Sequence, residues 1–252
     1  MKKNRLYKYG NMKKPTHLRK ILLKNKLWFS SPKDINDPLE FRPYFKIEKS
    51  KNDLQNAREF ISDLLKDEEP SYVEIAINNT EVVYDSLAEH SNNILSEVGV
   101  CCFSYLNDNL LMWAHYSDGH CGYCIEFSTL NNGIFKDYSF GNSLDVQYQK
   151  KYPLINLSDI QDKNYDTIVP LLFRSKSKDW EYEKECRFLR NTPGSESFLP
   201  ESLTGLILGC KMCEQDKKKI KEWISQRKTP LTLKQAVIDK KEYKLNFETI
   251  KI

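Results

Sequence analysis

The sequence contains no apolar run long enough to cross a membrane. Its longest apolar runs are short, such as that from Leu110 to Ala114, whereas a membrane-spanning helix needs about 20 apolar residues. The basic start at Met1 to Lys3 is followed by tyrosine and lysine rather than by the apolar segment of a signal peptide. Internal repeats and low-complexity linkers are absent as well. We therefore expect a cytoplasmic protein with no membrane partner.

The cysteines and the net charge narrow the class of protein further. The chain has 7 cysteines, an odd number, and Cys101 and Cys102 are adjacent. Without an export signal, this pattern favours reduced thiols over a set of disulfides. The formal net charge is only +4, which permits a nucleic-acid or nucleotide partner but does not require one.

Hydrophobic periodicity predicts an α+β fold in a single domain over residues 1–252, which is long enough to bury a substantial core. Thr16 is predicted to cap a helix that ends at Asn25. Further helices are expected over 53–66, 71–96, 109–116, 168–175 and after the GLILG segment. Strands are expected over 6–9, 27–29, 98–104, 122–127, 144–149, 185–189, 203–208, 231–238 and 243–250.

The order of these elements favours one arrangement of the fold. Helices are concentrated in the first half of the chain and strands in the second, which argues against repeated βαβ units. We expect two opposed, mainly antiparallel sheets, with residues 53–97 forming a helical insert that packs outside them.

The first cluster of chemically notable residues comprises LYKY at 6–9, LWFSSP at 27–32 and NDPLE at 36–40. A strand, a helix and a second strand could bring Lys8, Tyr9, Ser30 and Ser31 to one edge. The alternative is a plain strand–helix–strand start in which a serine caps a turn.

The second cluster, residues 101–127, is rich in Cys, His, Tyr and Trp. With a later CxxC pair it offers six candidate zinc ligands: His115, His120, Cys121, Cys124, Cys210 and Cys213. Structural zinc needs four ligands, usually in two close pairs on tight turns. The first CxxC pair falls on an expected strand, where alternation would point its two sulfurs to opposite faces. We therefore expect buried, inert cysteines and no metal site.

The third cluster is WEYEKECRF at 180–188. If it is extended from residue 181 onward, Glu181, Glu183, Glu185 and Arg187 share one face of a strand. Three carboxylates on one face repel each other unless a cation or a function holds them there. Arg187 can neutralise Glu185 and leaves Glu183 unpaired. The alternative is a solvated edge strand with an ordinary ion pair.

Together these clusters resemble the bacterial domain of unknown function 2971 family. The recurring pattern of that family is LYKY or LYRY, then LWFSSP with NDP, then FS with MW-x-HY and H-x-G-x-x-IEF, and finally W-x-YE-x-E-x-R. The chain matches every element in order between Leu6 and Leu189. Each element is short, but the ordered combination is specific. The family resemblance by itself implies no activity.

A looser resemblance is to the ADP-ribosyltransferase superfamily, which implies cleavage of NAD as a substrate. In that superfamily an early strand carries His or Arg, hydroxyl and aromatic groups lie beside nicotinamide, and a later strand carries a glutamate. The resemblance implies a catalytic glutamate at Glu183 or Glu185, with Glu183 favoured. It also implies a NAD-binding set of Lys8, Tyr9, Ser30, Ser31, Ser104, His115 and Tyr116. Position 8 departs from the pattern, because Lys replaces the usual His or Arg.

The implied reaction explains why these residue types are needed. Breaking the nicotinamide–ribose bond passes through an oxocarbenium-like species, which a nearby carboxylate stabilises. The resemblance implies transfer of ADP-ribose to an intracellular macromolecule, protein or nucleic acid. It also implies a role as a toxin or phage-defence effector with an antitoxin or regulatory protein as partner.

Two other functions remain open on the sequence. One is a non-catalytic binding or regulatory domain in which all three clusters are structural. The other is a metal-dependent nuclease or hydrolase that uses His115, His120 and Glu126 with carboxylates of the third cluster. The second alternative lacks an H-x-x-x-H or D-x-D signature.

Overall fold

The computed structural model describes residues 4–46, 95–130, 133–135, 143–156 and 165–251, together with isolated positions between 55 and 93. The helical insert predicted over residues 53–97 lies almost entirely outside these described residues. Within the described part of the chain, no helix combines the length and the apolar character needed to cross a membrane.

The described strands form one large sheet and three small ones. The large sheet has 8 strands in the order β14–β13–β12–β5–β1–β4–β10–β6. They are β1 (Arg5–Gly10), β4 (Gly99–Ser104), β5 (Tyr123–Ser128), β6 (Leu144–Asp145), β10 (Glu185–Arg190), β12 (Leu203–Leu208), β13 (Thr232–Ile238) and β14 (Leu245–Thr249). The two-stranded sheets pair β2 (Lys26–Phe29) with β11 (Gly194–Ser197), β3 (Tyr44–Lys46) with β8 (Leu154–Asn156), and β7 (Gln147–Gln149) with β9 (Ser175–Ser177).

Four described α-helices accompany these sheets: α1 (Pro15–Lys24), α5 (Leu110–Tyr116), α7 (Tyr165–Arg174) and α8 (Glu214–Ser225). Short 3₁₀ helices lie at η1 (Pro32–Asp34), η2 (Lys178–Glu183) and η3 (Pro200–Ser202). Pairing in the large sheet is antiparallel except between β12 and β13. The predicted α+β class with mainly antiparallel pairing is therefore confirmed.

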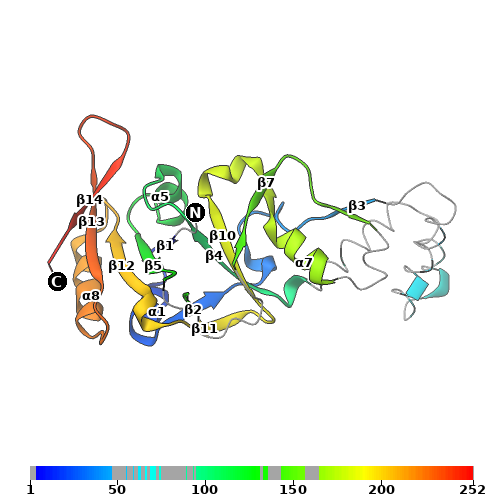
Figure 1. The fold of residues 1–252 in the computed structure, drawn as a ribbon, viewed down its shortest axis with the longest axis horizontal. Coiled ribbons are helices and arrows are strands. Elements are labelled where there is room, and N and C mark those ends of the chain that lie inside the picture. Colours follow the sequence, from blue (N-terminus) through cyan, green and yellow to red (C-terminus); the bar gives the residue numbers. More distant parts are fainter. Residues whose placement is uncertain are drawn as a thin grey trace.

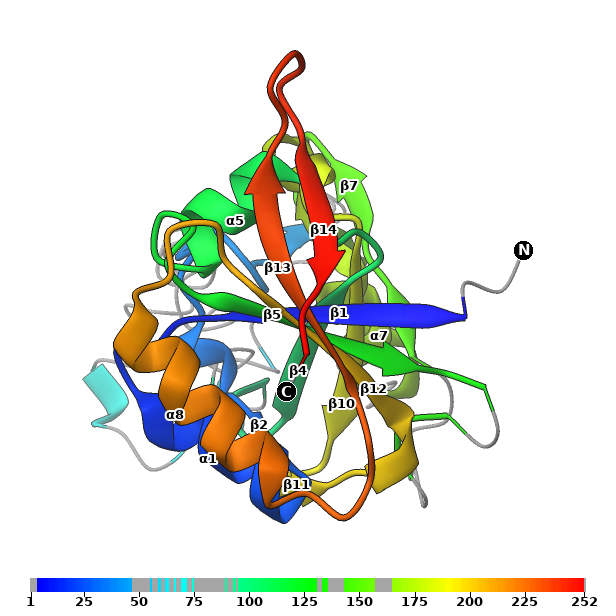
Figure 2. The ribbon, with the colours of Figure 1, turned by 90° about the vertical axis from the view of Figure 1, so that its left-hand side faces the viewer.

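The helices cover the two faces of the large sheet unequally. On one face, α1 and α8 bury Leu22 and Ile220 against sheet residues such as Ile125. Figure 2 shows these two helices lying side by side. On the other face, α5 buries Trp113 beside Tyr7. The sheet therefore has an extensive apolar core on one side and leaves room on the other side for polar groups beside α5.

Strands β1 and β4 meet at a single point in the middle of the large sheet. Their register contains one residue pair, Tyr7 with Ser104. By contrast, β1 pairs with β5 along its whole length, from Arg5 to Gly10. Figures 1 and 2 show the consequence, because β4 and β10 run in a different direction from β1 and β5. Beyond the shared pair the two strands diverge.

Two local predictions need correction. Thr16 is not the cap of α1, because the helix already begins at Pro15 with Lys14 in the capping position. Proline suits the first helical position since its fixed φ matches the helix and its missing N–H is not needed there. The strand expected over 144–149 is divided into β6 and β7, which belong to different sheets. The predicted end of α1 is confirmed, since Asn25 adopts the left-handed conformation with φ 49°.

Gly122 generates a prediction about stability, because the chain passes very close to it. A Cβ atom at this position would lie 2.2 Å from the backbone oxygen of Gly10 and 2.9 Å from that of Ser117. We expect Gly122→Ala to lower the free energy of unfolding by about 1–3 kcal/mol, since backbone atoms must move. Urea unfolding would measure this. In the control Gly205→Ala, the nearest atom lies 3.3 Å away, so the loss should be smaller, and equal losses would contradict the prediction.

Candidate functional site

A pocket of about 210 Å³ lies where β1 and β4 diverge. It is bounded by β1, β2, β4, α5, the start of β10 and residues that follow η1. Of the site residues predicted from the sequence, seven line it: Lys8, Tyr9, Ser30, Ser104, Tyr116, Glu183 and Glu185. These residues come from five separate segments of the chain, so tertiary structure is what gathers them.

Two predicted site residues lie elsewhere. Ser31 caps η1 by accepting a hydrogen bond from the Lys33 N–H, and its hydroxyl donates to the Ser96 carbonyl at 3.2 Å. His115 is exposed on α5, with its ring 6.3 Å from that of Trp180 and 6.2 Å from that of Tyr182. Ser31 therefore has the structural role that the sequence left open as an alternative, and His115 belongs to a neighbouring aromatic cluster.

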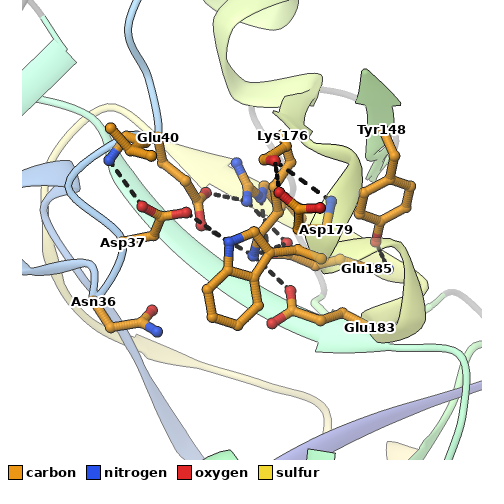
Figure 3. A network of polar contacts seen from close by, with 12 residues as sticks. Asn36, Asp37, Glu40, Tyr148, Lys176, Asp179, Glu183 and Glu185 are labelled. Atoms are coloured by element: carbon orange, nitrogen blue, oxygen red, sulfur yellow. Dashed lines mark hydrogen bonds and ion pairs between the residues drawn. The ribbon is translucent and has the colours of Figure 1, made fainter. Parts of the chain in front are cut away.

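The centre of the site is a buried lysine that the sequence reasoning missed. The Nζ atom of Lys176, in β9, lies 2.9 Å from Glu40 Oε1, 2.5 Å from Glu183 Oε2 and 3.0 Å from Glu185 Oε2. Figure 3 shows the three carboxylates pointing toward this ammonium group. Lys176 lies outside the three clusters of chemically notable residues in the sequence. Glu40 stands inside the NDPLE segment, but nothing in its spacing indicated a partner 136 positions away.

Arg187 is the second buried cation of this cluster. Its Nε and Nη2 atoms donate to the two oxygens of Glu185, each at 2.8 Å, and Nη2 also binds Glu40. Its Nη1 donates to the Phe173 carbonyl of α7 at 3.1 Å. The predicted pairing of Glu185 with Arg187 is therefore present. It uses the forked geometry that makes arginine a strong carboxylate partner.

The extended conformation predicted from residue 181 onward is wrong. Residues up to Glu183 form η2, and Lys184 has the left-handed φ of 44° before β10 begins at Glu185. This turn separates the three glutamates that a strand would have aligned. Glu181 is partly exposed and pairs with Lys184 at 3.2 Å, whereas Glu183 and Glu185 both turn inward to Lys176.

Burial and charge push the pKa values of these two glutamates in opposite directions. Burial raises the pKa of Glu183, and Lys176 only partly offsets this effect while Glu185 adds to it. Burial acts in the same direction on Glu185, but Arg187 and Lys176 outweigh it and lower the pKa of Glu185 to about 2. Paired carboxylates with diverging pKa values are typical of acid–base sites.

The charges around the pocket balance when the pocket wall is counted with the cluster. Three carboxylates, Glu40, Glu183 and Glu185, contact two cations, Lys176 and Arg187. A third cation, Lys8, lines the same pocket and interacts electrostatically with Glu185. The three buried carboxylates are therefore matched by three cations, as the cost of an unbalanced buried charge requires.

Hydrogen bonds from α5 and β4 hold Glu183 at the pocket wall. The Tyr116 hydroxyl donates to Glu183 Oε1 at 2.5 Å, and the Ser104 hydroxyl donates to the Glu183 carbonyl at 2.5 Å. Asn109, which caps α5, donates to the Tyr182 carbonyl at 3.2 Å. Burial, followed by the Glu183 charge, raises the pKa of Tyr116, so that its hydroxyl stays protonated as a donor.

Lys8 and Tyr9 form the opposite wall and are held by the segment around β4. Lys8 Nζ donates to the Cys102 carbonyl at 3.0 Å, and the Tyr9 hydroxyl donates to the Leu106 carbonyl at 3.1 Å. The two side chains thus connect β1 with β4 and the loop after it, where the backbones of the two strands have diverged. The walls of the pocket are therefore built by tertiary hydrogen bonds.

The residues proposed for a metal-dependent nuclease do not gather. Glu126 accepts hydrogen bonds from Arg5 and Thr204, whereas His120 lies beside Trp113 and His115 beside Trp180. Among the described residues, no group of three or more His, Cys, Asp or Glu could hold a metal ion. The 7 cysteines are all free thiols.

The prediction that Cys121 and Cys124 lie on one strand is wrong. Cys121 lies in the turn before β5 rather than on the strand with Cys124. Strand alternation therefore does not orient this pair of sulfurs.

The fold and site define an α+β protein with a buried carboxylate cluster at the wall of a small pocket. Residues 112–188 match the model of a family described as Protein of unknown function (DUF2971). This match confirms the resemblance to that family which the motifs indicated. The matched segment contains Tyr116, Lys176, Glu183 and Glu185. The chain has no match among curated proteins or among solved structures.

The buried cations generate a second prediction about stability. We expect Arg187→Met to lower the free energy of unfolding by about 3–5 kcal/mol, because Glu40 and Glu185 would lose a buried partner. Arg190→Met is the matched control on the same strand. Arg190 pairs with Glu196 at the surface, and such pairs contribute about 0–1 kcal/mol. Similar urea midpoints for the two variants would refute the structural role of Arg187.

The lowered pKa of Glu185 generates a prediction about acid unfolding. A carboxyl whose pKa falls from 4.5 to about 2 on folding stabilises the fold above pH 4.5. This stabilisation disappears as the pH falls toward 2. Glu183, with its raised pKa, acts in the opposite sense. We expect Glu185→Gln to flatten the dependence of unfolding free energy on pH between about 4.5 and 2. Glu183→Gln should instead act above pH 4.5, where it removes the loss of stability that ionising a carboxyl of raised pKa causes as the pH rises.

Urea titrations at several pH values would measure both slopes. Glu181→Gln, at a partly exposed carboxylate of the same segment, should keep the slope of the unsubstituted protein. Parallel slopes for Glu183→Gln and Glu185→Gln would contradict the assignment of opposite shifts.

Proposed function

We propose that this protein is a NAD-dependent ADP-ribosyltransferase that transfers ADP-ribose to a macromolecular acceptor, with Glu183 as its catalytic carboxylate. The observation that carries the proposal is the position of Glu183. It lies at the wall of a pocket also lined by Lys8, Tyr9, Ser104 and Tyr116, and Lys176 and Tyr116 hold its two oxygens. This position supports a role for Glu183 opposite a group that becomes positive during the reaction.

The division of the sheet supports the same proposal. An ADP-ribosyltransferase-like fold would have two opposed sheets with the substrate between them. Here β14–β13–β12–β5–β1 and β4–β10–β6 are joined through the single residue pair Tyr7 and Ser104. We infer that these two parts of the large sheet correspond to the two sheets of such a fold. The pocket between β1 and β4 would then be the substrate cleft.

The size of the pocket indicates which part of NAD it would hold. Its volume of about 210 Å³ is below the roughly 300–1,000 Å³ of pockets that enclose a whole drug-sized ligand. It suits the nicotinamide and its ribose rather than the full dinucleotide. Two larger pockets of about 700 and 690 Å³ border it, one sharing Lys176 and the other sharing Lys8, Tyr9 and Trp28. A transferase needs such space for the adenosine diphosphate and for the acceptor.

The electrostatics of the cluster suit the proposed reaction. Cleavage of the bond between nicotinamide and ribose builds positive charge on the ribose, as in glycoside hydrolysis. The carboxylate of Glu183 would stabilise that charge most strongly in the transition state, which lowers the barrier. Lys176 and Tyr116 would fix the two oxygens of Glu183, so that little reorganisation is needed.

Glu183 would also accept the proton that the transfer releases. As an acceptor O–H or N–H group attacks the ribose carbon, the bond to nicotinamide breaks and its electron pair leaves with the neutral base. The acceptor loses one proton, which Glu183 would take as a general base. The raised pKa of Glu183 brings it closer to the working pH, which favours this role. Glu185, held by Arg187 and with a lowered pKa, would stay ionised throughout.

Substitution of Glu183 tests this proposal. We expect Glu183→Gln to lower the rate of NAD consumption by about 100- to 10,000-fold, because the general base and its charge are lost. Release of nicotinamide would be followed by chromatography, and the melting temperature would be measured in parallel. Glu181→Gln is the matched control, since Glu181 lies in the same 3₁₀ helix but pairs with Lys184 outside the pocket. It should keep full turnover.

Two results would reject the proposal. One is full turnover by a folded Glu183→Gln protein, which would exclude this carboxylate as the catalytic group. The other is a failure of the unsubstituted protein to bind NAD in isothermal calorimetry.

A further inference from the structure

A groove of about 690 Å³ opens beside the site pocket and runs along α1. It shares Lys8, Tyr9 and Trp28 with that pocket, so the two are neighbouring parts of one surface. The groove is lined by basic side chains from β1, the connection that follows it, α1 and β2, namely Lys8, Lys13, Lys14, His17, Lys20 and Lys26. Within the described residues its lining contains no Asp or Glu.

The positive charge of this groove arises from the amino-terminal part of the chain. No Asp or Glu precedes Asp34 in the sequence, and β1, α1 and β2 all lie in that part. Lys13 pairs with Asp118 at 2.7 Å. In the part of the chain that the structure describes, Lys14, Lys20 and Lys26 form no ion pair. Such a surface attracts anions, and the attraction weakens with salt.

The spread of the lysines distinguishes between kinds of anion. Helix α1 has 10 residues and is therefore about 15 Å long. Lys14 stands at its start, Lys20 within it and Lys26 after its end. A single diphosphate would occupy only part of this length, whereas the phosphates of a nucleic-acid strand recur along it.

An aromatic side chain lies where the groove meets the site pocket. Trp28 has 55% of its surface exposed, although a large ring is normally mostly buried. Exposed aromatic rings that alternate with basic groups are typical of surfaces on which single-stranded bases stack. Trp28 therefore offers a stacking position beside the pocket.

From this geometry we propose that the lysine-lined groove binds single-stranded nucleic acid through its phosphates. The bound strand is also the acceptor of ADP-ribose, a part of the proposal that rests on the proposed transferase function. A base or sugar group must reach Glu183 in a pocket of about 210 Å³, and a base inside a duplex cannot enter such a space. The other bordering pocket, which is lined by Arg42, Lys150 and Lys151, is left for the diphosphate of NAD.

Salt-dependent binding tests the groove directly. The probe is a fluorescein-labelled single-stranded 12-mer, about as long as the strands that such binding sites cover. Its affinity would be measured by anisotropy at increasing NaCl concentration. We expect the double variant Lys14→Ala/Lys20→Ala to bind the probe more weakly. The slope of log K against log salt is negative for such binding, and its magnitude should decrease by about 0.7 for each lysine removed.

Lys240→Ala/Lys241→Ala is the matched control. It removes the same charge from the exposed β13–β14 connection, which lies far from α1 in both views (Figures 1 and 2). This variant should keep the salt slope of the unsubstituted protein.

Further measurements separate this inference from the proposed function. If the unsubstituted protein binds the 12-mer but never cleaves NAD, the transferase proposal and the acceptor role fail while the groove assignment stands. Equal slopes for the two lysine variants would overturn the groove assignment, and so would the absence of any binding. It would also be overturned if the groove variant lost affinity for ADP-ribose alone, because the groove would then belong to the dinucleotide.

Discussion

The buried contact between two cations and three glutamates is the interaction on which the site depends. Removing charges from water costs several kcal/mol per ion, so each must find a partner of opposite charge inside the fold. Arg187 meets this requirement for Glu40 and Glu185, and Lys176 contacts both of them as well as Glu183. These contacts join the segment after η1 to β9 and β10, while the guanidinium also binds the end of α7. The cluster thus ties together segments that the sheet alone would leave separate.

This constraint also explains why two glutamates close in sequence differ in chemistry. Glu185 begins a regular strand and receives two hydrogen bonds from the planar guanidinium of Arg187. Glu183 ends a 3₁₀ helix and shares its oxygens between Lys176 and Tyr116. The left-handed residue Lys184 turns the chain between them. One carboxylate is therefore held ionised as a structural anchor, and the other is left as the reactive group of the proposed mechanism.

The proposed acceptor groove and the carboxylate site connect through the divergence of β1 from β4. Lys8 and Tyr9 of β1 line both the pocket and the groove. Their hydrogen bonds to Cys102 and Leu106 keep the two parts of the sheet in contact after backbone pairing ends. Strand β1 would thus close the pocket through Lys8 and Tyr9, and Lys8 would also place a positive charge beside the groove.

The sequence by itself determined most of the secondary structure and much of the composition of the site. Periodic apolar residues such as Leu18 and Leu22 located α1, and the apolar GLILG segment located β12, because these patterns depend on local geometry. The resemblance to the ADP-ribosyltransferase superfamily predicted that Glu183 and Tyr116 share a site, and the two side chains are hydrogen-bonded. Tertiary structure alone decided the rest. Lys176 and Glu40 gave no local signal, since an ion pair across many residues leaves no periodicity. The turn at Lys184 was also missed, because an alternating pattern cannot show where one residue adopts a left-handed φ. This turn lets Glu183 and Glu185 both reach the buried Lys176.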